Sequence, residues 1–216
     1  MMKSVIELSE RKNSPDWVIN LSESDYPAAS AEEIINRLQT TPYDAHIHHE
    51  RICEGMEHRL WHHICRERYM QSSENYPFSE SYPCFAGEFW FMANRKAARE
   101  LINQYRTPSK LRLHLEELDE KNPITIPDEC FFATTLANSQ IITASTNNLR
   151  FVNWEPARSQ KEGERPIQAG PTILTVSHLD IIESSGALFI RKIHADKSEK
   201  LLSKLDQKII THKKQT

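Results

Sequence analysis

Residues 122–154 read NPITIPDECFFATTLANSQIITASTNNLRFVNW, and this stretch decides the fold of the chain. Inside it, Pro127 precedes an acidic pair, Asp128 and Glu129, and an amphipathic run follows. Proline suits the first turn of a helix and aspartate suits the N-cap, so the pattern predicts a helix entrance capped by Asp128. Residues 149–154 then form a short β-like segment that ends on an aromatic side chain. The stretch therefore predicts a helix followed by a strand.

Glu129 falls in the first turn of this expected helix. There the helix dipole and the free N–H groups favour the ionised carboxylate, which a proton acceptor at neutral pH requires. An alternative stays open, because acidic residues are favoured in first turns wherever helices start, and the acidic pair would then serve only to cap the helix. Side chains that recur at helical spacing are expected to pack inward, namely Phe131, Phe132, Thr135 and Leu136.

Several segments of the chain resemble one enzyme family. PDECFFATTLANS and NNLRFVNW, followed by SGALFIRKI, are similar to the C-terminal half of the core-2/I-branching glycosyltransferases, which include the peptide O-xylosyltransferases. NNLRFVNW and LFIRKI are closest to the xylosyltransferase branch. Upstream, WVINLSESDYPAASAEEI resembles the family's stretch built on INLS, DYP and S-x-x-E-I. The segments follow the family's order and span residues 17–193.

The resemblance implies the fold class. We expect an α/β fold, the C-terminal portion of a GT-A-like glycosyltransferase fold, with a mixed sheet flanked by helices. Residues 1–216 are expected to form a single domain that lacks the family's N-terminal nucleotide-binding part. Residues 156–170 are polar, contain two glycines and are expected to form a flexible loop.

The resemblance also implies roles for five residues. Glu129 occupies the position of the family's catalytic base, and the family inverts the anomeric configuration with this one carboxylate. Arg191 and Lys192 match the basic pair that binds the donor diphosphate, with Lys192 the stronger candidate. Trp154 matches a tryptophan that contacts the acceptor. Asp44, in the sequence DAH, matches a residue of the xylosyltransferases that would hydrogen-bond donor or acceptor hydroxyls.

Many sugar-nucleotide transferases hold the diphosphate through a metal bound to a D-x-D motif. No aspartate of this chain fits that motif, and the nearest matches are Glu23-x-Asp25 and Glu117-x-Asp119. We therefore expect no metal at the site and no cofactor besides the UDP-sugar donor. Fixed cations would carry the charge of the phosphates instead.

The predicted function is transfer of a sugar from a UDP-sugar to an acceptor hydroxyl, with inversion and without metal. The first choice of donor is UDP-xylose with a protein serine as acceptor, and the second is UDP-N-acetylglucosamine with a glycan as acceptor. The alternative is a non-catalytic carbohydrate- or peptide-binding remnant, which the expected absence of the nucleotide-binding part favours. The test that separates them is release of UDP.

Composition excludes other classes. The chain has 216 residues, 38% hydrophobic and 26% charged, with a net charge of -3, so neither a nucleic-acid binder nor a disordered tail is indicated. No apolar run approaches the roughly 18 residues of a membrane span, so the chain as given is expected to be soluble. The resemblance places full-length animal relatives in the Golgi membrane. The four cysteines form no C-x-x-C pair, and their redox state stays open.

Histidines suggest a third interpretation, a metal protein. Six of the ten lie between residues 46 and 63: His46, His48, His49, His58, His62 and His63. His58 and His62 are spaced i, i+4, so that one helical face would present both to a metal. No glutamate follows His58, however, and Arg59 would repel a cation. The sequence therefore favours solvated or hydrogen-bonded imidazoles.

The remaining patterns give a coarse map of elements. Ser30-x-x-Glu33 forms a capping box, with Ile34, Ile35 and Leu38 as the buried stripe of its helix. The expected strands are residues 17–21, covered on both faces and followed by a loop at 22–27, then 43–47, 88–92 and 187–193. The expected helices are residues 94–105, 109–120, 177–186 and 197–210.

Overall fold

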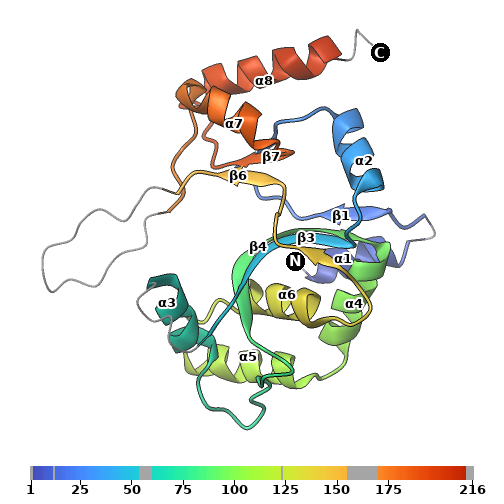
Figure 1. The fold of residues 1–216 in the computed structure, drawn as a ribbon, viewed down its shortest axis with the longest axis vertical. Helices are drawn as coiled ribbons and strands as arrows, with labels where there is room; N and C mark the ends of the chain where they lie inside the picture. Colours follow the sequence, from blue (N-terminus) through green and yellow to red (C-terminus); the bar gives the residue numbers. More distant parts are fainter. Residues whose placement is uncertain (1, 12, 54–59, 123, 155–169, 213–216) are drawn as a thin grey trace, which may run out of the picture. The chain divides into compact units, whose positions relative to one another are not determined.

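The computed structural model describes residues 2–11, 13–53, 60–122, 124–154 and 170–212. The chain divides into two compact units (Figure 1). The first unit is Met1–Asn20 with Pro42–Asn148, and the second is Leu21–Thr41 with Leu149–Thr216. Each unit combines a mixed sheet with helices, so the predicted α/β class is confirmed.

The sheet of the first unit has the strand order β1-β4-β3-β5. The bounds are Trp17–Ile19 for β1, Ala45–Arg51 for β3, Phe85–Asn94 for β4 and Ala144–Ser145 for β5. β4 is antiparallel to both β1 and β3, whereas β3 and β5 are parallel. The long strand β4 and its neighbour β3 are therefore the two inner strands of the sheet.

Gly87 is required by close approach of the backbone. The register of β3 and β4 shifts between Ile47 and His49, where His49 pairs with Gly87. A Cβ atom added at Gly87 would lie 2.0 Å from the carbonyl oxygen of His48. Any side chain there would push β3 away from β4.

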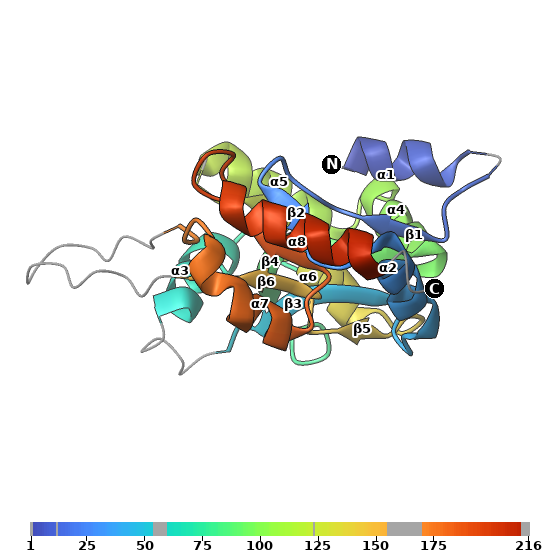
Figure 2. The same cartoon turned by 90° about the horizontal axis from the view of Figure 1, so that it is seen from above.

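Helices cover one face of this sheet, as Figures 1 and 2 show for α4 and α6. The helices of the first unit are α1 (Met2–Ser9), α3 (Leu60–Tyr69), α4 (Arg95–Arg106), α5 (Lys110–Lys121) and α6 (Pro127–Asn138). Asn94 caps α4 through the amide of Ala97, at 3.0 Å. α6 packs on β4 through aromatic side chains, and the rings of Phe91 and Phe132 lie 5.0 Å apart.

The entrance of α6 differs from the prediction. The N-cap is Ile126, which has a left-handed backbone with φ 49, and Pro127 occupies the first turn. Asp128 therefore lies inside the helix, and the prediction that it is the N-cap is wrong. The physical reason is that Pro127 starts the helix itself, because its fixed φ suits position N1. The inward-facing residues are confirmed as buried: Phe131, Phe132, Thr135 and Leu136.

The sheet of the second unit has the order β2-β7-β6. β2 (Asp25–Pro27) is antiparallel to β7 (Phe189–Arg191), and β6 (Arg150–Val152) is parallel to it. The helices of this unit are α2 (Ala31–Thr40), the 3-10 turn η1 (Val176–His178), α7 (Leu179–Ser185) and α8 (Glu199–His212). α7 and α8 cover one face of this sheet (Figure 1). The core they share with it contains Leu174, Ile182, Ile190, Leu201 and Leu205.

Local patterns in this unit are largely confirmed. The capping box of α2 is complete, since Ser30 accepts from the amide of Glu33 and Glu33 accepts from the amide of Ser30. Gly186 ends α7 with a positive φ of 64, as its sequence position predicts. Ile35 is 53% exposed, however, so its place in the buried stripe of α2 was wrong.

Two strand predictions are corrected. β1 is an edge strand in which only Val18 is buried, so it is not covered on both faces. Residues 22–27 are not simply a loop, because Asp25–Pro27 forms β2. Both errors concern pairing partners that are distant in sequence, which a local pattern does not reveal.

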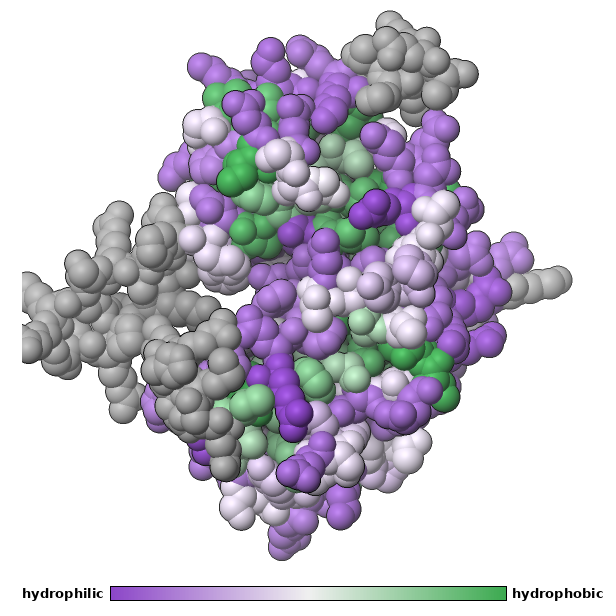
Figure 3. Space-filling view, viewed as in Figure 1, coloured by the Kyte–Doolittle hydropathy of each residue, from purple (hydrophilic) through white to green (hydrophobic). Residues whose placement is uncertain are grey.

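No helix in the described parts of the chain combines the length and the apolar character needed to cross a membrane. Figure 3 shows apolar side chains in small groups between polar ones on the face drawn. Among the exposed large apolar residues are Ile124, Ile181 and Ile210. Exposed apolar side chains of this kind are normal on a protein surface and need no partner.

Candidate active site

Glu129 is held by two consecutive residues at the end of α3. Its Oε2 atom accepts a hydrogen bond from Nη1 of Arg68 at 3.2 Å. The hydroxyl of Tyr69 lies 3.5 Å from the same oxygen and shares its single proton between this contact and the carbonyl of Ile126. The side chain of Glu129 is 20% exposed and that of Arg68 is 17% exposed, so the pair is largely shielded from water. One oxygen of this carboxylate therefore has fixed partners.

Burial raises the pKa of the Glu129 carboxyl above its ordinary value. The charge of Arg68 and the hydrogen bond from Tyr69 lower this pKa, and the charges of Glu88 and Asp128 raise it further. The expectation that the first turn favours the ionised form is thus corrected, because desolvation outweighs the favourable neighbours. A carboxylate with a raised pKa is a stronger base once it is ionised.

Two more carboxylates lie in this region. Glu88 of β4 accepts a hydrogen bond from Nδ2 of the buried Asn148 at 2.7 Å. Asp128 neighbours Glu129 on α6, and burial raises the pKa of its carboxyl. Arg68 therefore places a positive charge beside a group of three carboxylates, those of Glu88, Asp128 and Glu129.

The end of α3 is fixed by its own contacts. Tyr69 is fully buried, and its hydroxyl donates to the carbonyl of Ile126 at 3.1 Å. His114 of α5 approaches the carbonyl of Tyr69 with Nε2 at 2.7 Å, and its Nδ1 lies 2.6 Å from the hydroxyl of Ser73. Because a carbonyl only accepts, Nε2 of His114 carries the proton and Nδ1 accepts from Ser73. These bonds tie α3 to α5 and to the entrance of α6.

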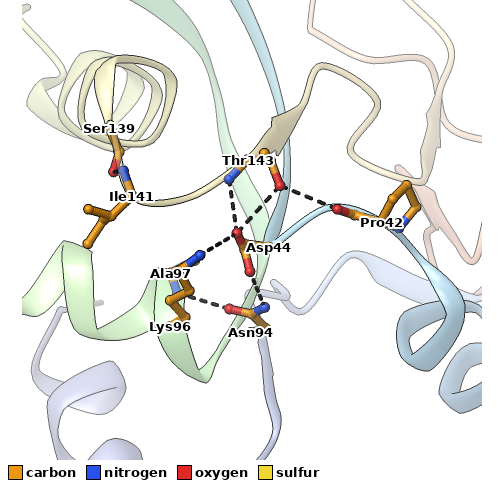
Figure 4. A network of polar contacts seen from close by, with 8 residues as sticks. All are labelled: Pro42, Asp44, Asn94, Lys96, Ala97, Ser139, Ile141 and Thr143. Carbon is orange, nitrogen blue, oxygen red and sulfur yellow. Dashed lines mark hydrogen bonds and ion pairs between the residues drawn. The ribbon is translucent and has the colours of Figure 1, made fainter.

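Asp44 lies elsewhere in the first unit, in the network drawn in Figure 4. Its Oδ1 accepts from Nδ2 of Asn94 at 2.8 Å. Its Oδ2 accepts from the amide of Thr143 at 3.0 Å and from Nζ of Lys96 at 3.3 Å. Burial raises the pKa of Asp44, but these three donors outweigh it and hold the pKa below its usual range. None of these partners contacts Glu129, so the structure does not bring the two carboxylates together.

The other three predicted site residues belong to the second unit. β6 and β7 are parallel, and Val152 pairs with Arg191, so the carboxyl ends of both strands lie at one edge of the sheet. Lys192 follows β7 directly and is exposed. Trp154 follows β6, is 42% exposed and pairs with Pro171 through the backbone. This edge therefore gathers the basic pair and the predicted acceptor platform.

Arg191 and Lys192 differ in their surroundings. Nη1 of Arg191 lies 3.8 Å from Oδ2 of Asp25, and Arg191 also donates to the hydroxyl of Ser22. Among the described residues, no carboxylate pairs with the ammonium of Lys192. Arg191 is thus built into the fold, whereas Lys192 presents its charge to solvent.

The comparison with protein families decides the identity of the chain. The model of the core-2/I-branching enzymes matches residues 3–183. The chain belongs to the core-2/I-branching family. A relative in Arabidopsis thaliana, Beta-glucuronosyltransferase GlcAT14B, is 25% identical over 207 residues, which are 90% of this chain and 44% of that protein. The chain therefore spans less than half the length of that glycosyltransferase.

Family membership confirms the resemblance seen in the sequence and fits the α/β fold. The matched range contains Asp44, Glu129 and Trp154 and ends before Arg191 and Lys192. Asp44 and Glu129 are both largely shielded and both have a cationic partner, but Arg68 beside Glu129 is only 17% exposed, whereas Lys96 beside Asp44 is 55% exposed.

The histidines of this core-2/I-branching chain make ordinary hydrogen bonds. Nε2 of the buried His62 lies 3.1 Å from Glu50, and Nδ1 of His46 lies 3.1 Å from the carbonyl of Asn147. No group of three or more metal-ligating side chains occurs in the described ranges of the chain. His58 lies outside those ranges, as do residues 156–169 of the flexible loop predicted at 156–170. All four cysteines are free, and the sulfurs of Cys84 and Cys130 are 4.0 Å apart.

Sequence reasoning missed several residues of the site. Arg68 is 61 residues from Glu129 along the chain, and no local signal marks an arginine near a helix end as a partner of a distant carboxylate. Glu88 did leave a signal, because it is a charged residue inside the otherwise apolar strand FAGEFWFM.

Proposed function

We propose that this chain carries the catalytic base of an inverting glycosyltransferase that moves a sugar from a UDP-sugar to an acceptor hydroxyl. The observation that supports this most strongly is Glu129: its PDE segment resembles that of the family's catalytic base, its side chain is shielded from water, and burial raises the pKa of its carboxyl. A base of this kind matches the proton that an attacking hydroxyl must lose.

The reaction needs one carboxylate. As the acceptor oxygen attacks the anomeric carbon, Glu129 takes the hydroxyl proton, the new glycosidic bond forms and UDP leaves with the bonding electrons. A single displacement inverts the configuration, so no second carboxylate is required as nucleophile. The role of the rest of the site is to position the acceptor in line and to balance the charge of the departing diphosphate.

Lys192 is the residue we assign to the departing diphosphate. Its ammonium is exposed at the edge where β7 ends, and Arg191 beside it adds positive charge while anchored to Asp25. Two fixed cations can neutralise a diphosphate without a metal, and the chain has no D-x-D motif. Trp154, exposed at the same sheet edge, offers an aromatic plane for the C–H face of a sugar or for a peptide.

Three UDP-sugars are candidates for the donor. The sequence segments favour UDP-xylose, with UDP-N-acetylglucosamine second. The Arabidopsis relative is named a glucuronosyltransferase, which adds UDP-glucuronic acid as a third candidate. Xylose and glucuronic acid have the same ring and differ by the carboxylate on C5, so one site fold can serve either sugar with a local change of charge. The acceptor is a serine hydroxyl of a protein or a hydroxyl of a glycan.

The alternative class is a binding remnant that holds carbohydrate or peptide without transferring sugar. The two classes differ in one measurable event, which is release of UDP in the presence of acceptor.

The test combines binding and turnover. The purified chain is titrated calorimetrically with UDP and the three UDP-sugars, first in EDTA and then with manganese, and then incubated with serine peptides and glycans. We expect binding in EDTA, UDP release and a product one sugar heavier. Glu129→Gln should lower kcat by about 10²- to 10⁴-fold with donor affinity retained. Lys192→Ala should weaken UDP binding, and Lys200→Ala on α8 should not.

Each contrary result has a meaning. Glycan or peptide binding without UDP release would favour the remnant. Normal turnover by Glu129→Gln would remove Glu129 from the role of base. A strict need for manganese would contradict the metal-independent mechanism.

A further inference from the structure

Arg68 has no role in the family resemblance, yet it makes the shortest side-chain contact of the candidate base. Its Nη1 lies 3.2 Å from Oε2 of Glu129, and both side chains are at most 20% exposed. An ion pair shielded in this way is stronger than a surface pair, because water and salt screen it less.

The contacts of Glu129 are one-sided. Arg68 and Tyr69 both approach Oε2. Among the residues that the structure describes, none donates a hydrogen bond to Oε1. One oxygen is therefore fixed, and the other is left to accept a proton from outside the protein.

The charges around Glu129 explain why a cation is needed. From α3 it faces Arg68, Tyr69 and the buried thiol of Cys65, whose pKa burial raises, so that this thiol stays neutral. From β4 it faces Glu88, and on its own helix Asp128. Asp119 of α5 acts on Asp128. Arg68 is thus the cation that acts on Glu129, against the two carboxylates of Glu88 and Asp128.

We propose that Arg68 is a positioning residue for Glu129: it fixes Oε2 and keeps the shielded carboxylate ionised, so that Oε1 can act as the base. The function of the pair rests on the proposed glycosyl transfer, whereas the electrostatic coupling itself does not. Without Arg68, a carboxylate that is desolvated and flanked by two others takes up a proton rather than remaining charged.

The position of Arg68 is set by contacts that its substitution would leave in place. Tyr69, the next residue, is fully buried and bonds the carbonyl of Ile126, and His114 bonds the carbonyl of Tyr69. The end of α3 should therefore stay where it is when the guanidinium alone is removed. This makes Arg68→Gln a test of charge rather than of folding.

The direct test is the titration of Glu129 in the intact chain, followed by NMR of the ¹³C-labelled side-chain carboxyls and assigned with Glu129→Gln. We expect Arg68→Gln to move the midpoint of Glu129 to higher pH, and Arg68→Lys to restore most of the difference. Arg99→Gln, which removes an exposed arginine from α4, is the matched control and should leave the midpoint unchanged. Coinciding midpoints in wild type and Arg68→Gln would overturn the proposal.

Activity provides the second readout. With the preferred donor and acceptor, the acidic limb of kcat/KM should move to higher pH in Arg68→Gln by the same amount as the NMR midpoint. If the NMR midpoint of Glu129 moves but the acidic limb of kcat/KM does not, the coupling between Arg68 and Glu129 is supported. The role of Glu129 as the base is then contradicted. A moved midpoint in a chain that shows no turnover would likewise support the coupling and count against the proposed function alone. If Arg68→Gln loses its native amide spectrum, the milder Arg68→Lys decides: a midpoint equal to that of wild type supports charge.

Discussion

Oδ1 of Asp25 and Nε of Arg150 lie 2.9 Å apart, and neither side chain is exposed to solvent. The same carboxylate faces Arg191 at 3.8 Å and accepts from the amide of Ser22 at 2.6 Å. Asp25 therefore joins β2 to the two strands whose ends carry the predicted phosphate and acceptor residues. Removing a charge from water costs several kcal/mol, and a buried pair offsets this cost only while both partners are present.

Asp25→Asn should destabilise the second unit by about 3 to 5 kcal/mol, because Arg150 would stay buried while losing the negative charge of Asp25. Urea unfolding followed by hydrogen exchange in β6 and β7 measures the loss. Glu183→Gln is the control, since Glu183 pairs with Lys208 at the surface at 3.2 Å and should contribute at most about 1 kcal/mol. Equal losses in the two variants would show that the buried pair has no special weight.

Gly87→Ala should destabilise the first unit by about 1 to 3 kcal/mol, the usual cost of overpacking. The reason is the 2.0 Å approach between a Cβ at this position and the carbonyl oxygen of His48. Gly170 is the matched control, because no atom lies within 4 Å of its Cβ position. Thermal unfolding of the two alanine variants compares them directly, and a Gly87→Ala protein as stable as Gly170→Ala would mean that β3 moves aside freely.

Elements that are determined by neighbouring residues were predicted from the sequence, whereas pairings between distant segments were not. The helices of residues 94–105 and 109–120 were predicted within one residue at each end, because Asn94 and Ser109 cap them through neighbouring amides. The pairing of Asp25–Pro27 with Phe189–Arg191 was not predicted, since nothing in either segment specifies the other. The cap of α6 was misplaced because Pro127 and Asp128 both suit a helix start, and only the backbone of Ile126 decides between them.

In the candidate site, too, some residues could be predicted from local sequence and others could not. Glu129, Lys192 and Trp154 were identified from sequence segments, which carry residue types in a fixed order. Arg68 and Asn148 were not, because their importance lies in contacts to Glu129 and Glu88 across 61 and 60 residues of chain. Desolvation of Glu129 was missed for the same reason: it depends on what packs around the helix start.

Relative to wild type, Glu129→Gln should gain stability as the pH rises from about 4.5 through the raised folded pKa of Glu129. The pKa of Glu129 is raised in the folded state above its ordinary value of 4.5, so the ionised form costs stability. This cost is fully present above the folded pKa and disappears as pH falls below about 4.5, where Glu129 is protonated in the unfolded chain as well. Glutamine removes an ionisation that the folded site disfavours.

Thermal unfolding of wild type and Glu129→Gln between pH 4 and pH 8 measures this effect. The advantage of the variant should grow with pH and vanish at the acidic end. Glu116→Gln, on the exposed side of α5, should show no such trend. A Glu129→Gln protein that is less stable at pH 8 than at pH 4, relative to wild type, would contradict the raised pKa.

The pKa of Asp44 is shifted in the opposite direction to that of Glu129, so its ionised form should stabilise the fold. Its pKa is held below the ordinary value of 3.8 by Asn94, Thr143 and Lys96, so the ionised form stabilises the fold. This stabilisation is complete above 3.8 and is lost as pH falls through the lowered folded pKa.

Asp44→Ala should therefore cost about 1 kcal/mol at pH 7, because Asn94, Thr143 and Lys96 lose their hydrogen-bond acceptor, and the difference from wild type should shrink on acidification. Calorimetric unfolding from pH 7 to pH 3 measures it, with Asp16→Ala at an exposed pair with Arg95 as the control. The network occupies both oxygens of Asp44, so ligand affinity should be unchanged in the folded variant. Normal stability with a loss of sugar-nucleotide or acceptor affinity would instead support the role in hydroxyl binding that the family resemblance implies.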